Sequence, residues 1–170
     1  TGSARRVGAQ IARSLHAAGY DLALHCRRSR AELDDLAKEL ELQRPDSVLV
    51  LQADLSNVEM LPDLIDAALE RFGRLDALIN NASAFEATPV GSVTPAQWDE
   101  LFASNARAPF FLAQAAAAAL AQTGGCIVNL VDIYAERPLA RHPVSGWARF
   151  TRSACDFCGK IPAFWPIASV

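Results

Sequence analysis

The stretch T-G-S-A-R-R-V-G, residues 1–8, sets two glycines at the start of a predicted amphipathic helix. Val7, Ile11 and Leu15 recur at four-residue intervals, as one face of a helix requires. A glycine turn that opens a helix brings backbone N–H groups close to a bound phosphate. The stretch therefore predicts a dinucleotide-phosphate site, and the alternative is a loop glycine beside a solvated pair of arginines.

Helical periodicity alternates with short apolar strands beyond this turn. Such alternation calls for right-handed crossovers and a parallel sheet with helices on both faces. We therefore expect an α/β fold with a Rossmann-like, doubly wound parallel sheet. The expected helices run from the glycine turn to Gly19 and over 30–43, 58–72 and 95–122, and the expected strands over 21–26, 48–51, 75–79 and 127–131.

The two ends of the sequence lead us to expect an incomplete fold. A glycine turn of this type normally follows a strand, and none precedes Thr1. After Val144 the sequence loses its periodicity, and residues 145–170 hold two of the three Trp and two of the four Cys. We expect residues 1–144 to form one partial domain, with the first strand and the C-terminal part missing, and residues 145–170 to be an unrelated, poorly ordered tail.

The composition of the chain argues against nucleic acid, membranes and metal ions as binding partners. The net charge of -3 provides no broad attraction to nucleic acid or to anionic membranes. No apolar run approaches the roughly 20 residues that span a bilayer. Scattered cysteines without a secretory leader favour a cytoplasmic protein with reduced thiols. Cys155 and Cys158 have no second pair nearby, so we expect no metal site.

The end of the second expected strand carries the basic residues Arg27 and Arg28, followed by Ser29. In dinucleotide sites a carboxylate at this position binds the ribose 2'-hydroxyl of NAD, whereas arginine pairs with the 2'-phosphate of NADP. No Asp or Glu lies between Asp21 and Glu32. The pattern favours NADP, and the alternative is a solvated basic turn.

Two further strand ends carry polar or small residues. Asp54 could accept a hydrogen bond from an adenine amino group while Leu55 covers the ring, although Asp54 could equally cap the next helix. The segment N-N-A-S-A-F, residues 80–85, would let the chain pass close to a cofactor sugar and offers the flat face of Phe85. An asparagine-rich turn that bonds its own backbone is the alternative.

Two polar residues lie at the remaining candidate positions. Asn105 interrupts an apolar helix and needs a polar partner, which water or a backbone carbonyl would satisfy. Asp132 follows the last expected strand at the mouth of the site, where a carboxylate could deliver a proton or could be an ordinary loop residue.

Taken together, T-G-S-A-R-R-V-G, L-H-C-R-R-S, A-D-L-S, N-N-A-S-A-F, S-N-A-R-A-P-F-F-L and V-N-L-V-D-I-Y-A-E-R-P-L resemble short-chain dehydrogenases/reductases, and specifically the pteridine reductases. The resemblance runs from Thr1 to about Val144. Arg6, where most of the superfamily has glycine, and Asp132, where most members have serine, are the departures that single out this subgroup.

The resemblance implies NADPH-dependent reduction of a pterin or folate ring in a protein that is usually a homo-oligomer, although this chain lacks the usual interface. The implied cofactor contacts are Gly2, Arg6, Val7, Gly8, Arg27, Arg28, Ser29, Asp54, Leu55, Asn81, Ala82 and Ser83. The implied substrate contacts are Ser83 and Phe85, and the implied catalytic residues are Asp132 and Asn105, the latter through a proton-relay water.

The resemblance breaks just after H-P-V, where the family has a tyrosine and, four residues later, a lysine. Ser145 and Arg149 stand in these places. Because a serine hydroxyl is a far weaker acid than a tuned phenol, we expect catalysis to be impaired. The alternatives are a non-catalytic NADP-binding or regulatory fragment, or a related carbonyl or acyl-carrier-protein reductase.

Overall fold

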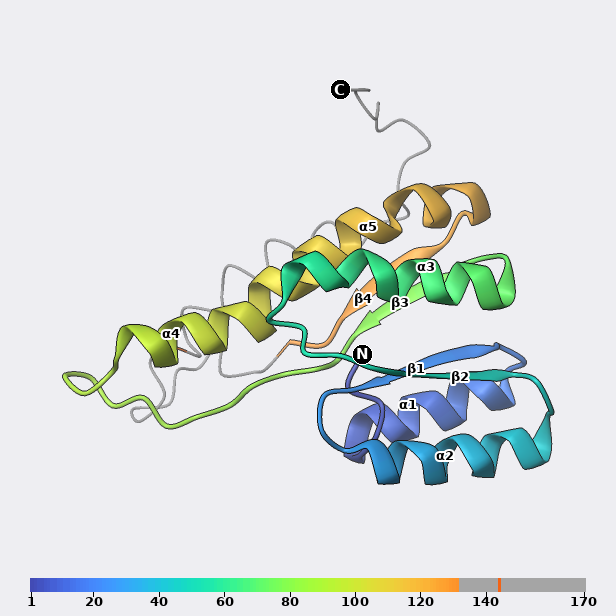
Figure 1. Cartoon of the computed structure of the whole chain (residues 1–170), viewed down its shortest axis with the longest axis horizontal. Coiled ribbons are helices and arrows are strands. Elements are labelled where there is room, and N and C mark those ends of the chain that lie inside the picture. The colour runs from blue at the N-terminus through green and yellow to red at the C-terminus, as the bar shows by residue number, and fades with distance from the viewer. Residues whose placement is uncertain (132–143, 145–170) are drawn as a thin grey trace.

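The computed structural model describes residues 1–131 and residue 144, and it shows an α/β arrangement with parallel strands (Figure 1). None of the helices in these residues is long and apolar enough to cross a membrane. In chain order the elements are α1 (Arg6–Ala17), β1 (Leu22–Cys26), α2 (Arg30–Gln43), β2 (Val48–Gln52), the 3-10 turn η1 (Val58–Met60), α3 (Leu61–Phe72), β3 (Ala77–Asn80), α4 (Pro95–Phe102), the π-helical segment η2 (Ala103–Arg107), α5 (Ala108–Thr123) and β4 (Cys126–Asn129).

The expected helix over 95–122 is present, but a π-helical segment interrupts it. Thr94 caps its start in a reciprocal capping box with Gln97. Gly124, with φ of 65°, ends it in a left-handed conformation that suits glycine. Between these ends lies η2, around Asn105, in which backbone hydrogen bonds span five residues rather than four. Periodicity alone does not reveal such a segment.

Strand β4 ends at Asn129, two residues before the sequence pattern predicts. Its partner β3 ends at Asn80, and the backbone N–H of Leu130 makes the last bond of the ladder to the Asn80 carbonyl at 2.9 Å. Beyond this bond β3 offers no further backbone partner. Leu130 and Val131 therefore extend the apolar sequence pattern but are not part of the strand.

The four described strands form two two-stranded parallel sheets, β1 with β2 and β3 with β4. The backbone groups of Leu22 and Cys26 bond toward β2, so the backbone groups of Ala23 and His25 point to the opposite edge of β1. In the other sheet, Ala77 and Ile79 face away from β4 in the same manner. A groove of about 560 Å³ lies between these two edges. The expected doubly wound sheet is thus present as two halves.

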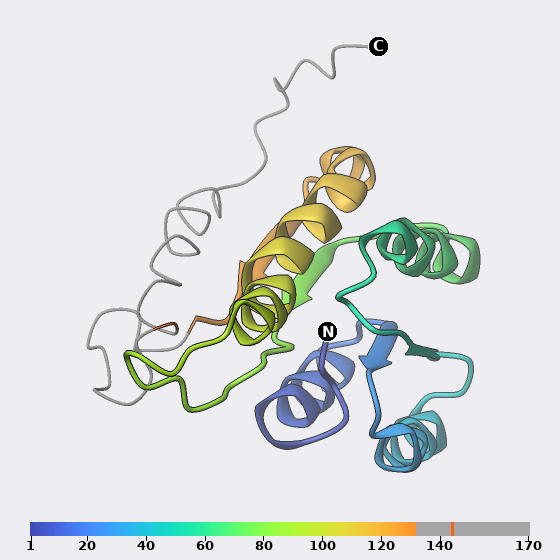
Figure 2. The ribbon, with the colours of Figure 1, turned by 60° about the vertical axis from the view of Figure 1, so that its left-hand side comes forward.

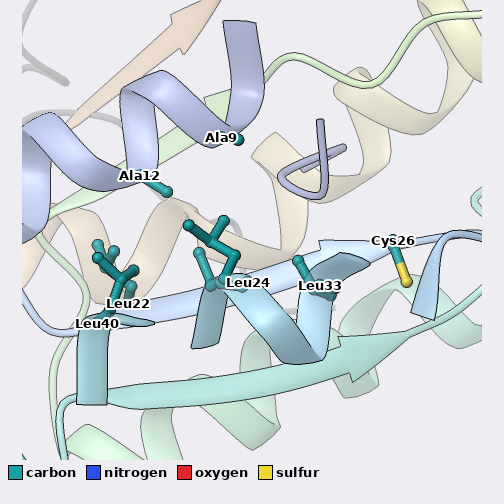
Figure 3. Close-up of a cluster of buried hydrophobic side chains, with 8 residues drawn as sticks. Ala9, Ala12, Leu22, Leu24, Cys26, Leu33 and Leu40 are labelled. Carbon is teal, nitrogen blue, oxygen red and sulfur yellow. The ribbon is translucent and has the colours of Figure 1, made fainter. Parts of the chain in front are cut away.

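Each half has its own hydrophobic core. In Figure 1, α1 and α2 lie on one side of the strands and α3 and α5 on the other, and Figure 2 shows the same division from a second direction. The first core joins α1, β1 and α2 (Figure 3), and its buried members are Ala9, Ala12, Leu22, Leu24, Cys26, Leu33, Leu36 and Leu40. The second joins α3, β3 and α5, with Leu61, Ile65, Leu78, Leu112 and Leu120 among its buried members.

Candidate functional site

The glycine turn lies at the carboxyl ends of β1 and β3, the two strands that border the groove between the half-sheets. The N–H of Ser3 donates to the carbonyl of His25 at the end of β1, at 2.8 Å. The amino group of Thr1 donates to the carbonyl of Ile79 in β3, at 2.6 Å. Gly2, between them, has φ of 66°, a conformation that L-residues with side chains rarely adopt. The first three residues therefore bridge the two half-sheets.

Asn81 fixes this turn from the other half-sheet. Its side-chain amide donates to the carbonyls of Thr1 at 3.1 Å and Gly2 at 2.9 Å. In return, the hydroxyl of Thr1 accepts from the backbone N–H groups of Asn81 at 3.1 Å and Ala82 at 3.0 Å. The asparagine that follows β3 is thus a structural clamp on the turn. The expectation that residues 80–85 let the chain pass close to a bound sugar is not tested by these contacts.

Replacing Asn81 with alanine should lower the free energy of unfolding by about 1–3 kcal/mol, because two carbonyls of the turn lose their side-chain donor. Urea denaturation measures this loss. Asn57→Ala is the matched control, since no hydrogen bond of the Asn57 side chain is seen within residues 1–131. Equal losses in the two variants would contradict the clamp.

The N-terminus of α1 is open to an anion. No side chain caps it, and its first turn contains no acidic residue. Arg6 stands at its first position and forms no ion pair with another described residue, whereas Arg5 is paired with Glu32. The free N–H groups and the positive end of the helix dipole both favour a negative group at this point. The glycine turn, the N-terminus of α1 and the side chain of Arg6 thus lie together at the same pocket.

The basic turn after β1 is only partly free. The Nε of Arg27 donates to Oδ2 of Asp54 at 2.7 Å, and its Nη1 donates to Oε1 of Glu100 at 3.4 Å. Asp54 also accepts from the N–H and hydroxyl of Ser56 at 3.0 and 2.8 Å. The Ser56 and Arg27 bonds hold the pKa of the Asp54 carboxyl below its usual range. Asp54 therefore closes the turn after β2, but it does not cap the next helix as the alternative supposed, because η1 begins after Asn57 and α3 after Met60.

A pocket of about 390 Å³ joins these groups. Its walls come from the glycine turn, the start of α1, the ends of β1 and β2, the loop after β3 and the helix α4. Of the predicted cofactor residues it brings together Gly2, Arg6, Val7, Gly8, Arg27, Asp54, Leu55, Asn81, Ala82 and Ser83. Arg28 and Ser29 lie beside the pocket in sequence but not in its lining. Asp132 lies outside the described residues.

The side chain of His25 links the glycine turn to the segment after β2. The ring accepts from the Gly2 N–H at Nδ1, 3.3 Å away, which leaves Nε2 to donate to the Ala53 carbonyl at 3.1 Å. Both bonds require the neutral ring with its proton on Nε2. Burial, and secondarily the nearby amino group of Thr1, lower the pKa of His25 from 6.5 to about 4. His25 is therefore part of the support of the site.

Asn105 binds the loop after β3 rather than standing alone in its helix. Its amide nitrogen donates to the Ala84 carbonyl and its oxygen accepts from the Ala84 N–H, both at 2.8 Å. The π-helical segment that carries Asn105 places it beside this loop. Phe85 follows immediately, with 54% of its surface exposed. Asn105 therefore positions the loop that carries Ser83 and Phe85.

Sequence reasoning missed Arg5, His25, Ser56, Ala84, Glu100 and Ser104 among the residues that line the pocket. For His25 the available signal was a histidine inside an apolar strand directly before a basic turn. Glu100 gave no signal, because 73 residues separate it from Arg27. Within residues 1–131, the acidic residues, cysteines and histidines form no cluster that could hold a metal ion.

The amino-acid sequence is similar to a known protein family and to several curated reductases. A protein-family model described as short chain dehydrogenase matches residues 1–146. Pteridine reductase 1 of Leishmania tarentolae is 36% identical over 197 aligned positions, which cover 91% of this chain and 68% of that protein.

Two other curated relatives have names that refer to different substrates. Versicolorin reductase of Emericella nidulans is 29% identical over 164 positions, which cover 94% of this chain and 62% of that protein. A putative ketoacyl reductase of the granaticin polyketide synthase of Streptomyces violaceoruber is 34% identical over 142 positions, which cover 81% of this chain and 55% of that protein. The chain thus spans between about half and two thirds of the length of these relatives.

Proposed function

The chain belongs to the short-chain dehydrogenase family, and we propose from this premise that its pocket binds NADPH for the reduction of a pterin or folate ring. Membership of the family implies a nicotinamide cofactor. The observation that carries the choice of NADPH is the pair Arg27 and Arg28 at the end of β1, with no carboxylate between Asp21 and Glu32. Arginine suits a 2'-phosphate, and a carboxylate would suit a 2'-hydroxyl.

The residues present fit the phosphate groups of such a cofactor. Gly2 bends the backbone tightly beside the uncapped start of α1, and Arg6 adds a cation there. Helix N–H groups bind the pyrophosphate, Arg28 and Ser29 bind the 2'-phosphate with Arg27, and Asp54 and Leu55 border the adenine. Bound NADPH would supply a hydride to the substrate. The side of the pocket formed by the 81–83 loop would then face the reacting ring.

The substrate side of the site is assigned to Ser83 and Phe85, with the aromatic face of Phe85 against the pterin. Asn105 keeps one amide hydrogen and one oxygen lone pair after its two bonds to Ala84. These remaining positions suit a water molecule that passes a proton, and Asp132 is the proposed acid that supplies it. The name of the Leishmania relative supports the pterin assignment over the other substrate classes.

Cofactor selectivity tests the proposal. NADPH should bind the full chain about ten-fold or more tightly than NADH, because the 2'-phosphate gains charge-assisted hydrogen bonds. Replacing Arg28 with alanine should remove most of this difference and leave NADH affinity unchanged. Quenching of intrinsic fluorescence measures both affinities. Arg30→Ala is the control, since Arg30 is paired with Asp34, and equal affinity for the two cofactors in the unmodified chain would overturn the NADPH assignment.

A second candidate is nucleotide binding without turnover. Ser145 and Arg149 stand where the family resemblance calls for tyrosine and lysine. Loss of a positioned proton donor lowers a rate by about 10² to 10⁴. NADPH oxidation in the presence of a dihydropterin distinguishes the two candidates: binding with turnover supports the reductase, and binding without turnover supports the regulatory alternative.

A further inference from the structure

The two arginines after β1 differ in their freedom to bind a phosphate. Arg27 lies between two carboxylates, with Asp54 at 2.7 Å from its Nε and Glu100 at 3.4 Å from its Nη1. Arg28 makes no ion pair with any residue from 1 to 131. The charge of Arg27 is therefore already balanced, and the charge of Arg28 is available.

The two carboxylates on Arg27 are not equivalent. Asp54 is held in place by Ser56, whose N–H and hydroxyl both donate to it, so it would remain in place without the arginine. The carboxylate of Glu100 has Arg27 as its only hydrogen-bond partner in the described part of the chain. It reaches across the pocket from α4, and it lines the same cavity as Arg27 and the glycine turn. Glu100 is thus the partner that a competing anion would displace.

We propose that Glu100 is a specificity-determining residue, a counter-ion that competes with a nucleotide 2'-phosphate for Arg27. This inference rests on the proposed binding of NADPH. A phosphate placed at Arg27 would lie beside the Glu100 carboxylate and be repelled by it, whereas an adenosine without the 2'-phosphate would feel little of this charge. Glu100 therefore weakens the discrimination between the two nucleotides and leaves most of the recognition to Arg28.

The test compares 2',5'-ADP with 5'-AMP on the full chain, measured by isothermal titration calorimetry. Glu100→Gln keeps the size of the side chain and removes its charge. It should tighten 2',5'-ADP binding by about two- to five-fold, the range expected for a half-exposed ion pair, and leave 5'-AMP binding unchanged. The gain should shrink at about 1 M salt, where charges are screened beyond about 3 Å.

Asp99→Asn is the matched control. Asp99 is exposed, adjacent to Glu100 on α4, and forms no ion pair within residues 1–131, so its variant makes the same change in net charge away from Arg27. An equal gain in both variants, or no gain in Glu100→Gln while 2',5'-ADP still binds, would overturn the role of Glu100 and leave the proposed function standing. Absence of 2',5'-ADP binding in the unmodified chain and in both variants would overturn both.

Discussion

Replacing Gly8 with alanine is expected to lower the free energy of unfolding by about 3 kcal/mol, the upper end of the usual range for overpacking. A β carbon at Gly8 would overlap the carbonyl oxygen of Gly2 and lie 2.6 Å from the side-chain nitrogen of Asn81. Neither group can retreat cheaply, because Gly2 is part of the tight turn and Asn81 is bonded to that turn. Urea denaturation followed by circular dichroism measures the loss.

Gly19→Ala separates this close approach from the general effect of removing a glycine. Gly19 has φ of 93°, and a β carbon there would meet nothing within 4 Å. Its substitution should cost only the strain of a left-handed residue, about 1–2 kcal/mol. Gly8→Ala should also abolish nucleotide binding, which Gly19→Ala should leave intact. If the two variants lost the same stability and both kept binding, the packing of Gly8 against the turn would have no energetic role.

Acidification from pH 6.5 to pH 4 should destabilise the chain by roughly 3 kcal/mol through His25 alone. The pKa of His25 falls from 6.5 to about 4 on folding, chiefly because the ring is buried. In this pH window the unfolded chain binds the proton and the folded chain does not. The contribution is therefore complete above pH 6.5 and is lost as the pH falls toward 4. Protonation of Nδ1 would also break its bond with the Gly2 N–H.

The variant His25→Gln provides the comparison, because glutamine can offer an acceptor and a donor to the same partners without titrating. The free energy of unfolding of this variant should vary much less between pH 6.5 and pH 4 than that of the unmodified chain. Burial lowers the pKa of the Thr1 amino group from 8.0 to about 6. Its contribution to the free energy of unfolding is therefore lost mainly as the pH falls from 8.0 to about 6, at higher pH than that of His25. Parallel pH profiles of the two proteins below pH 6.5 would contradict the role of His25.

The sequence predicts the order of the elements because each one carries its own local signal. Helix α2 shows this well, since its four buried residues follow the helical spacing that the sequence displays. The two glycines of the turn and the basic residues after β1 are also local features. The fold class predicted from these signals is confirmed, and most element boundaries agree within two residues.

Contacts between distant segments are what the sequence could not supply. The bond from Arg27 to Glu100 depends on where α4 lies relative to β1, which no pattern within either element specifies. The same holds for Asn105, whose partner Ala84 lies 21 residues away and which is positioned by a π-helical segment. All the predicted contacts with cofactor or substrate stay predictions, and Arg28 and Ser29 do not line the pocket that joins most of the others.

The bridge formed by the first three residues also bears on how the molecule unfolds. Each half has a core of its own, and the turn at Thr1, Gly2 and Ser3 is bonded to β1 on one side and to β3 on the other. A ligand seated on this turn would tie two folding units together, so part of its binding free energy would appear as cooperativity between them. The candidate binding pocket would then also couple the stabilities of the two halves.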